Sequence, residues 1–264
     1  MAITTLDGYI ASIKQRAVWS KTTTRTTVAN GWFSLFDVAG QPGAGTLAAG
    51  NTANGLVHTD ATSGYPLVSP FSGSNLGYIG RVVGGSTVAC RIALFDRLFV
   101  CGAYAFNANT ALTSQPSFSA RVPGANYSGL EIWVEQVTAA TGNQAVNVTY
   151  TDQDNNAGAT TGAVGVGAAP TQGRCWQLPL AAGDSGVRLI QNVTGSVATA
   201  GTFNVMVLRR LWEGRIQIAN GSNEQGALDV GLPEIFADSA LYALVAADST
   251  SSGLPDLDVQ IVNG

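Results

Sequence analysis

The segment LEIWVEQV, residues 130–137, has an aliphatic residue at every second position over its first five residues. Its two alternating sets are Leu130, Ile132 and Val134 on one side and Glu131, Trp133 and Glu135 on the other. A two-residue period places alternate side chains on opposite faces of an extended backbone. The segment therefore predicts a β-strand with one apolar face turned toward a core.

The next apolar segment, AVNVTYT at residues 145–151, shows the same period, with Val146, Val148 and Tyr150 on one side. The connection between the two segments, TAATGNQ, is short and rich in turn-forming residues. Two alternating segments joined in this way are typical of an antiparallel hairpin, which we predict here.

A second hairpin is predicted from GVRLIQNV at 186–193 and TFNVMVLRRLW at 202–212, which are joined by the small-residue loop 194–201. The last segment, LDVQIVN at 257–263, alternates in the same way. Strands separated by Gly and Pro, with few helical patterns between them, favour an all-β antiparallel β-sandwich or jelly roll.

The composition agrees with a chain dominated by turns and strands. Charged residues make up 11% of the 264 residues, about half the usual share, and there are 32 glycines. We expect one β-sandwich domain over residues 19–264, and the alternative is a division near the polar, Pro-bearing segment 107–117. Low surface charge gives weak repulsion between copies, which favours a protein that works inside an assembly.

Residues 1–18 are expected to form an N-terminal helical arm. Leu6, Tyr9, Ile10 and Ile13 recur at the spacing of one helix face, and Thr5 or Asp7 can cap the helix start. This apolar face either packs on the protein's own sheet or docks on a neighbouring subunit. The spacing alone leaves both alternatives open.

The segment RIALFDRLFVCGAY at 91–104 combines charges with a dense apolar run. Part of it, IALFDRLF, resembles VMVLRRLW at 205–212, where Arg209 occupies the position of Asp96 and Arg210 that of Arg97. A position that accepts either sign of charge is typical of a strand edge or rim. We therefore interpret Asp96 and Arg97 as structural charges at a strand edge or rim rather than as catalytic groups.

The sequence offers little for catalysis. The one histidine, His58, lies in a loop-like segment with Asp60 nearby, and no G-x-S-x-G motif accompanies them. Glu131 and Glu135 share a strand face but lie more than about 10 Å apart by strand rise, a poor match to a glycosidase pair. We expect no enzyme, with a surface-polysaccharide hydrolase as the least favoured alternative.

Cofactor and metal sites have equally weak signals. Asp152, Asp154 and Asn156 alternate like the first half of a calcium loop, but Gly158 falls one position late, so turn formation is the favoured interpretation. We expect no cofactor. The three cysteines, Cys90, Cys101 and Cys175, are expected to be buried, inert thiols, with a redox pair as the alternative.

Charge and hydropathy bear on partners and location. The net charge of −4 speaks against a nucleic-acid partner, since such proteins normally present a basic stripe. No segment has the roughly 20 apolar residues of a membrane span, and the N-terminus lacks the pattern of a secretory signal. We expect synthesis in the cytoplasm, without membrane insertion.

Several segments together resemble a family of virion structural proteins of tailed bacteriophages. They are MAITTLDGYIASIK, LEIWVE, VNVTYTDQDNNAG, LPLAAGDSGVR, GTFNVMVLRRL and ALDVGLPEIFADSALYALVAA, which are spread over most of the chain. In the family that they resemble, these strand and turn patterns have no known catalytic role. The resemblance implies a structural role, and we take the protein to be similar to capsid decoration, or cement, proteins.

Such a protein is expected on the outer surface of the phage capsid, made in the bacterial host cytoplasm. Its partners would be the major capsid protein and, as a homotrimer, copies of itself, which would stabilise the shell by bridging its subunits. The alternative is another virion component, such as a tail or receptor-binding module that binds glycans.

Apolar and aromatic anchors dominate protein interfaces. The candidate intersubunit contacts are Leu6, Tyr9, Ile10, Ile13, Trp32 and Phe33. The competing interpretation places all six in the core of the chain itself.

Overall fold

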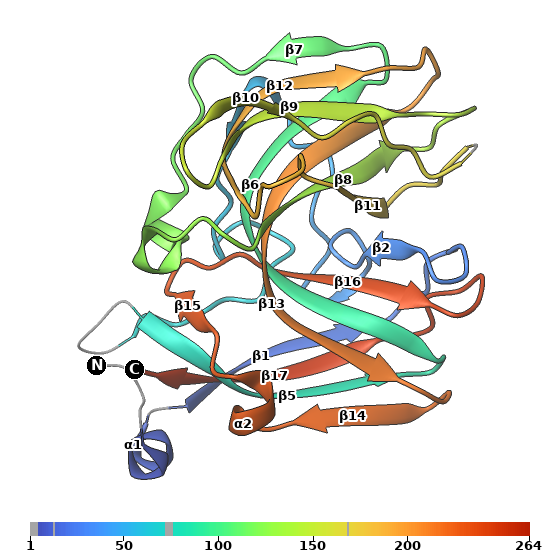
Figure 1. Ribbon diagram of the computed structural model, residues 1–264. Helices are drawn as coiled ribbons and strands as arrows, with labels where there is room; N and C mark the ends of the chain where they lie inside the picture. The colour runs from blue at the N-terminus through green and yellow to red at the C-terminus, as the bar shows by residue number, and fades with distance from the viewer. Residues whose placement is uncertain (1–4, 13, 72–75, 168) are drawn as a thin grey trace.

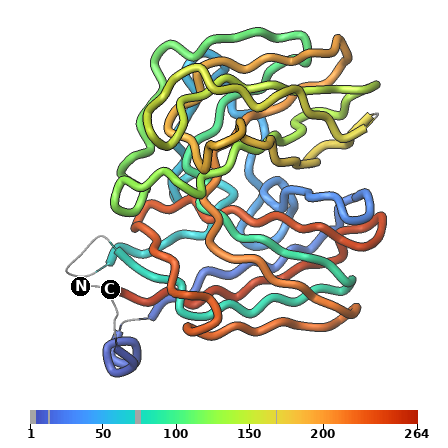
Figure 2. The backbone as a smooth tube through the Cα atoms, viewed as in Figure 1, coloured from blue at the N-terminus to red at the C-terminus, as the bar shows by residue number. Residues whose placement is uncertain are grey.

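The alternating segments become strands of three antiparallel sheets in the computed structural model (Figure 1). The structure describes residues 5–12, 14–71, 76–167 and 169–264. One sheet occupies the centre of the molecule, and the other two cover it from above and below, as the backbone tube also shows (Figure 2). We call them the central barrel, the upper sheet and the lower sheet.

The central barrel is a six-stranded sheet that closes on itself, because its first and last strands pair with each other. In order around the barrel the strands are β13 (Thr202–Ile216), β8 (Leu130–Thr138), β11 (Arg174–Leu178), β2 (Trp32–Ser34), β16 (Leu241–Ala247) and β6 (Cys90–Ala105). A further strand, β4 (Asn51–Leu56), pairs with β6 outside this ring.

The two covering sheets are open. The upper sheet runs β10 (Ala157–Thr160), β9 (Val146–Asp152), β12 (Val187–Gly195) and β7 (Asn109–Ala111). The lower sheet runs β14 (Gly221–Gln225), β5 (Leu76–Ser86), β17 (Asp256–Asn263), β1 (Lys14–Lys21) and β3 (Gly40–Gln41), and β15 (Glu234–Phe236) also pairs with β5. The described helical elements are α1 (Leu6–Ala11), α2 (Ala227–Val230) and 3-10 turns at Ser119–Arg121 and Pro123–Ala125.

Strands β6 and β13 are long enough to pass from one end of the barrel to the other, and they pair along almost their whole length. Leu98 and Phe99 of β6 belong to the core under the upper sheet, whereas Ile92 and Leu94 belong to the core above the lower sheet. A third cluster, which includes Phe95 of β6, fills the barrel itself. The two sandwiches therefore share strands.

The predicted fold class is confirmed: the chain is all-β and antiparallel, with a short N-terminal helix. The predicted apolar faces are also confirmed. Leu130, Ile132 and Val134 pack in the upper core together with the apolar faces of β9 and β13. The opposite face of β8 is buried too, since Trp133 packs in the barrel cluster and Glu135 is fully buried.

Both predicted hairpins are wrong in their pairing, although each of their strands exists. Strand β8 pairs with β11 and β13, and β9 pairs with β10 and β12. Strand β12 likewise pairs with β7 and β9 rather than with β13. The connections 139–145 and 196–201 carry the chain from one sheet to another, because consecutive strands here cover opposite sides of one core.

The N-terminal helix is shorter than the predicted arm. Thr5 caps it, as its side-chain oxygen accepts a hydrogen bond from the backbone N–H of Gly8 at 3.0 Å. Strand β1 begins at Lys14 and so takes up the last part of the range 1–18. Segment 107–117 contains β7 of the upper sheet. Among the described helices, none has the length and hydropathy to cross a membrane.

Candidate functional site

Asp96 and Arg97 are adjacent on β6 and are the most deeply buried charges of the segment 91–104. Asp96 is 0% exposed and Arg97 is 1% exposed. The prediction that they sit at an edge or rim is therefore wrong, because β6 lies between two other barrel strands and is covered on both faces. As neighbours on one strand they point to opposite faces, and each has its own set of partners.

Arg97 lies in the barrel cluster. Its guanidinium donates to Glu135 Oε2 at 3.2 Å and lies over the ring of Tyr242, 5.1 Å from the centroid. Glu135 also accepts from the Tyr242 hydroxyl at 2.6 Å and from Asn204 Nδ2 at 3.1 Å. Three donors on three different strands thus satisfy one buried carboxylate.

Asp96 faces the other way, between Leu94 of the lower core and Leu98 of the upper core. Its carboxylate pairs with Arg121 at 3.2 Å and with Arg209 at 3.3 Å. Its remaining partners are the Ser239 hydroxyl at 2.8 Å and the Ala240 N–H at 3.1 Å. Arg209, which the internal similarity aligned with Asp96, is its cross-strand neighbour and ion-pair partner.

These two networks hold strands together. The carboxylates of Asp96 and Glu135 are fully buried, so a solute has no route to them in this fold. Glu131 and Glu135 are also not arranged as a glycosidase pair. Glu131 accepts a hydrogen bond from the Trp133 indole N–H at 2.6 Å and forms an ion pair with Arg210 at 2.9 Å. The chemistry that this arrangement supports is charge pairing inside a core.

His58 is attached to the same barrel network. Its Nδ1 lies 2.9 Å from the Tyr65 hydroxyl, and burial, together with the charges of Arg97 and Arg121, lowers its pKa to about 3. Asp60 is engaged elsewhere, since Oδ2 accepts from the Val68 N–H at 2.9 Å. His58 and Asp60 are therefore not assembled as a catalytic pair.

The calcium-like segment forms a turn. Asp152 Oδ1 accepts from the N–H groups of Asp154 and Asn156, both at 2.8 Å, and Oδ2 accepts from Asn156 Nδ2 at 2.8 Å. These bonds lower the pKa of Asp152, chiefly through the Asn156 side chain. Within the described ranges, no three His, Cys, Asp or Glu side chains gather as a metal site would require.

All three cysteines are buried and free, as predicted. Burial raises the pKa of Cys101 to about 12 and raises the pKa of Cys175 and Cys90 as well. Thiols with raised pKa values are poor nucleophiles at neutral pH.

The candidate intersubunit residues divide into two groups. Phe33 is completely buried in the lower core, so its side chain has no surface with which to contact another subunit. Trp32 is half-buried under the Arg91 guanidinium, 4.9 Å from its ring centroid. Leu6 and Ile10 are 72% and 63% exposed, and Ile13 lies outside the described residues.

Tyr9 fixes α1 to the lower sheet. Its hydroxyl donates to Gln260 Oε1 at 2.8 Å, while no residue of α1 is buried. The alternative that the apolar face of the helix packs on the protein's own sheet therefore fails for Leu6 and Ile10, which face solvent.

An apolar groove of about 510 Å³ lies between α1 and α2. Leu6 and Tyr9 line one side, and Leu228 and Leu232 line the other, with Leu228 98% exposed. We call this surface the helix edge and define it by Leu6, Ile10, Leu228, Asp7 and Asp229, of which the two carboxylates are exposed. It presents apolar and acidic groups together.

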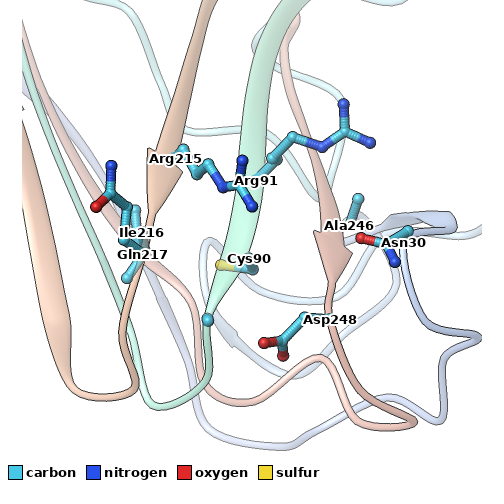
Figure 3. A pocket seen from close by; sticks show the side chains of 9 residues that line it. Asn30, Cys90, Arg91, Arg215, Ile216, Gln217, Ala246 and Asp248 are labelled. Carbon is cyan, nitrogen blue, oxygen red and sulfur yellow. The ribbon is translucent and has the colours of Figure 1, made fainter.

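A second surface lies at the opposite end of the lower sandwich, where the barrel strands β13 and β16 end and β6 begins. We call it the loop end and define it by Arg91, Arg215, Val28, Ile218 and Asp248. Val28 and Ile218 are 60% and 70% exposed. Between the charged residues lies a hollow of about 250 Å³, drawn in Figure 3.

Arg91 and Arg215 are direct cross-strand partners in the β6–β13 ladder. Figure 3 shows Arg215 reaching from β13 across β6, and Arg91 reaching from β6 toward β16. Arg91 has a partner, because it lies 3.7 Å from Glu213 Oε1. Arg215 has no side-chain hydrogen bond or ion pair with any described residue. Two like charges face each other here, which is unfavourable unless an anion joins them.

Sequence reasoning found Leu6, Tyr9 and Ile10 but missed Leu228 and Arg215. Leu228 recurs with Val230 and Leu232 at every second position, a spacing that is typical of a strand and does not indicate an exposed helical turn. Arg215 is the second-last residue of β13, at a position where the alternation predicts a polar side chain. Only the pairing of β13 with β6 reveals that it faces another arginine.

No family model and no curated protein matches the sequence. Among solved structures, infectious bursal disease virus, Gx strain, aligns at 9% identity over 95% of this chain and 80% of that chain, with a TM-score of 0.16. T=1 particles derived from infectious bursal virus align at 8% identity over 95% and 77%, with a TM-score of 0.18. A marine algae virus of the order Picornavirales aligns at 11% identity over 100% of this chain and 73% of that chain, with a TM-score of 0.12. Similarity this weak carries no argument about fold or function.

Proposed function

We propose that the protein is a structural subunit of a tailed-bacteriophage virion, which binds the outer capsid surface as a decoration protein and bridges major capsid subunits. The observation that carries the proposal is the pair of exposed surfaces, the helix edge and the loop end, on one sandwich. Each combines apolar side chains in water with charged residues. Exposed apolar side chains with charged neighbours are typical of surfaces that bind another molecule.

Two further observations support an architectural role. The sequence segments that resemble virion proteins contain structural elements of this fold, including β8, β9, β13, β16 and both short helices. The buried ion pairs of Asp96 and Glu135 join β6 to β8, to β13 and to the turn at Ser119–Arg121, which favours a rigid barrel. The role that we propose needs no catalytic step and no cofactor.

Co-sedimentation with expanded, undecorated capsids tests this function. The purified protein should bind saturably, with a fixed number of copies per major capsid subunit, and should raise the temperature at which the shell disrupts. A decoration protein from an unrelated phage serves as the control for nonspecific adsorption. Absence of binding, combined with binding to host glycans, would overturn the proposal in favour of a receptor-binding tail module.

A further inference from the structure

The helix edge and the loop end lie at opposite ends of the same strands. Strand β1 starts directly after α1 and leads into the loop that contains Val28. Strand β14 runs back from the turn after Ile218 to α2, which carries Leu228. Eight residues of β1 span roughly 26 Å at about 3.3 Å per residue. Figure 1 shows α1 at one side of the lower sheet and the ends of β13 and β16 at the other.

The charges of the two surfaces are complementary. The helix edge has Asp7 and Asp229, whose carboxylates form no ion pair with a described residue, and the loop end has the equally unpaired Arg215. A charge of the opposite sign also lies near each surface, a lysine at the helix edge and an aspartate at the loop end. Lys14 lies beside α1, where its ammonium donates to the carbonyl oxygens of Tyr9 and Ile10, and Asp248 lies at the loop end.

The apolar groups are matched as well. Leu6, Ile10 and Leu228 are exposed at the helix edge, while Val28 and Ile218 are exposed within two residues of Asn30 and Gln217, which line the hollow of the loop end. A contact of the helix edge with its own copy would bring Asp229 toward carboxylates of the same sign. A contact with the loop end of another copy instead pairs opposite charges and buries apolar groups on both sides.

We propose that the helix edge of one copy binds the loop end of a second copy of this chain, with Asp229 pairing with Arg215. Such a contact joins two different surfaces, so it repeats from copy to copy and closes into a ring when the rotation allows. The proposed decoration protein is expected to be a homotrimer, so we assign three copies to this ring. The inference rests on the proposed function and adds the contact between copies. Self-association of the purified protein tests it without a capsid.

Charge reversal tests the pairing on the full-length protein. Sedimentation equilibrium at low salt should show a trimer for the wild type. Arg215→Glu and Asp229→Arg should each weaken self-association by about tenfold or more, since each places like charges across the contact. The double variant, Arg215→Glu with Asp229→Arg, should recover association to within about threefold of wild type, because the two reversed charges again attract each other across the contact.

Arg81→Glu is the matched control, because Arg81 is an exposed arginine of the lower sheet whose partner is Glu224. It changes the net charge as Arg215→Glu does and should leave self-association unchanged. A monomeric wild type, single variants that associate like Arg81→Glu, or a double variant no better than the singles would each overturn the inference. A monomer that still binds capsids would overturn the contact between copies but not the proposed function. A trimer that binds no capsid would overturn the proposed function but not the contact.

Discussion

The residues that most resemble catalytic groups are here parts of buried ion pairs. Asp96 and Glu135 each accept several donors, and each is fully enclosed. A buried pair is itself weak evidence of stability, but removal of one partner leaves the other charge buried without compensation. The clearest tests at this scale therefore remove one side of a pair.

Glu135→Gln should lower the free energy of unfolding by about 3 to 5 kcal/mol, because Arg97 would lose its charged partner inside the barrel. Denaturant unfolding measures the loss. Glu213→Gln is the control, since Glu213 forms exposed ion pairs with Arg210 and Arg91 and should cost less than about 1 kcal/mol. Equal effects of the two changes would contradict the structural role of Glu135.

His58 should make the protein less stable as the pH falls. Its pKa drops from 6.5 to about 3 on folding, so the unfolded chain binds the proton first between these values. Stability is therefore complete above pH 6.5 and declines below it, by up to about 2 kcal/mol between pH 7 and pH 5. Urea unfolding at pH 7, 6 and 5 measures this, and His58→Gln should flatten the dependence. An unchanged slope in the variant would show that other groups cause it.

Sequence reasoning identified charge type at this scale but not environment. The alternation at 91–104 places Asp96 and Arg97 on opposite faces, and only the covering of both faces makes each of them internal. A strand buried on one face and a strand buried on both faces have the same sequence pattern when the second face carries polar residues. These residues are buried because they bond to other side chains across the barrel. Glu135 is such a residue, since its donors come from β6, β13 and β16.

At the scale of elements, the sequence predicts where strands lie but not which strands they join. The faces of β8, β9 and β13 follow from their two-residue period, which is a local property. Pairing depends on which sheet receives the chain after each turn, and short connections between sheets look like hairpin turns. The helix edge depends on the meeting of α1 with α2, which are more than 200 residues apart and therefore leave no local signal.

Gly102 of β6 is an element-scale requirement of the β6–β13 ladder. It has a φ of +147°, and a Cβ there would lie 2.3 Å from Asn204 Oδ1 and 2.9 Å from the Phe203 carbonyl oxygen. Gly102→Ala should cost about 1 to 3 kcal/mol from the backbone alone, with the clash in addition. Thermal unfolding measures it against Gly43→Ala, where a Cβ meets open space. Equal stability of the two variants would contradict this close approach.

At the scale of the whole molecule, the shared strands predict one cooperative unit. Residues of β6 and β13 belong to both the upper and the lower core, so neither sandwich can unfold without breaking the other. Calorimetry should show a single transition, with a calorimetric enthalpy close to the van't Hoff value. Two separate transitions would show that the halves unfold independently.

The most direct test of the virion assignment is a cryo-electron microscopy reconstruction of undecorated phage capsids saturated with the purified protein. The account predicts symmetric density on the outer surface, formed by rings of three copies in which α1 and α2 of one copy contact the Arg91–Arg215 hollow of the next. A shell without added density, when the protein is in excess, would contradict the proposal that this chain is a capsid decoration subunit.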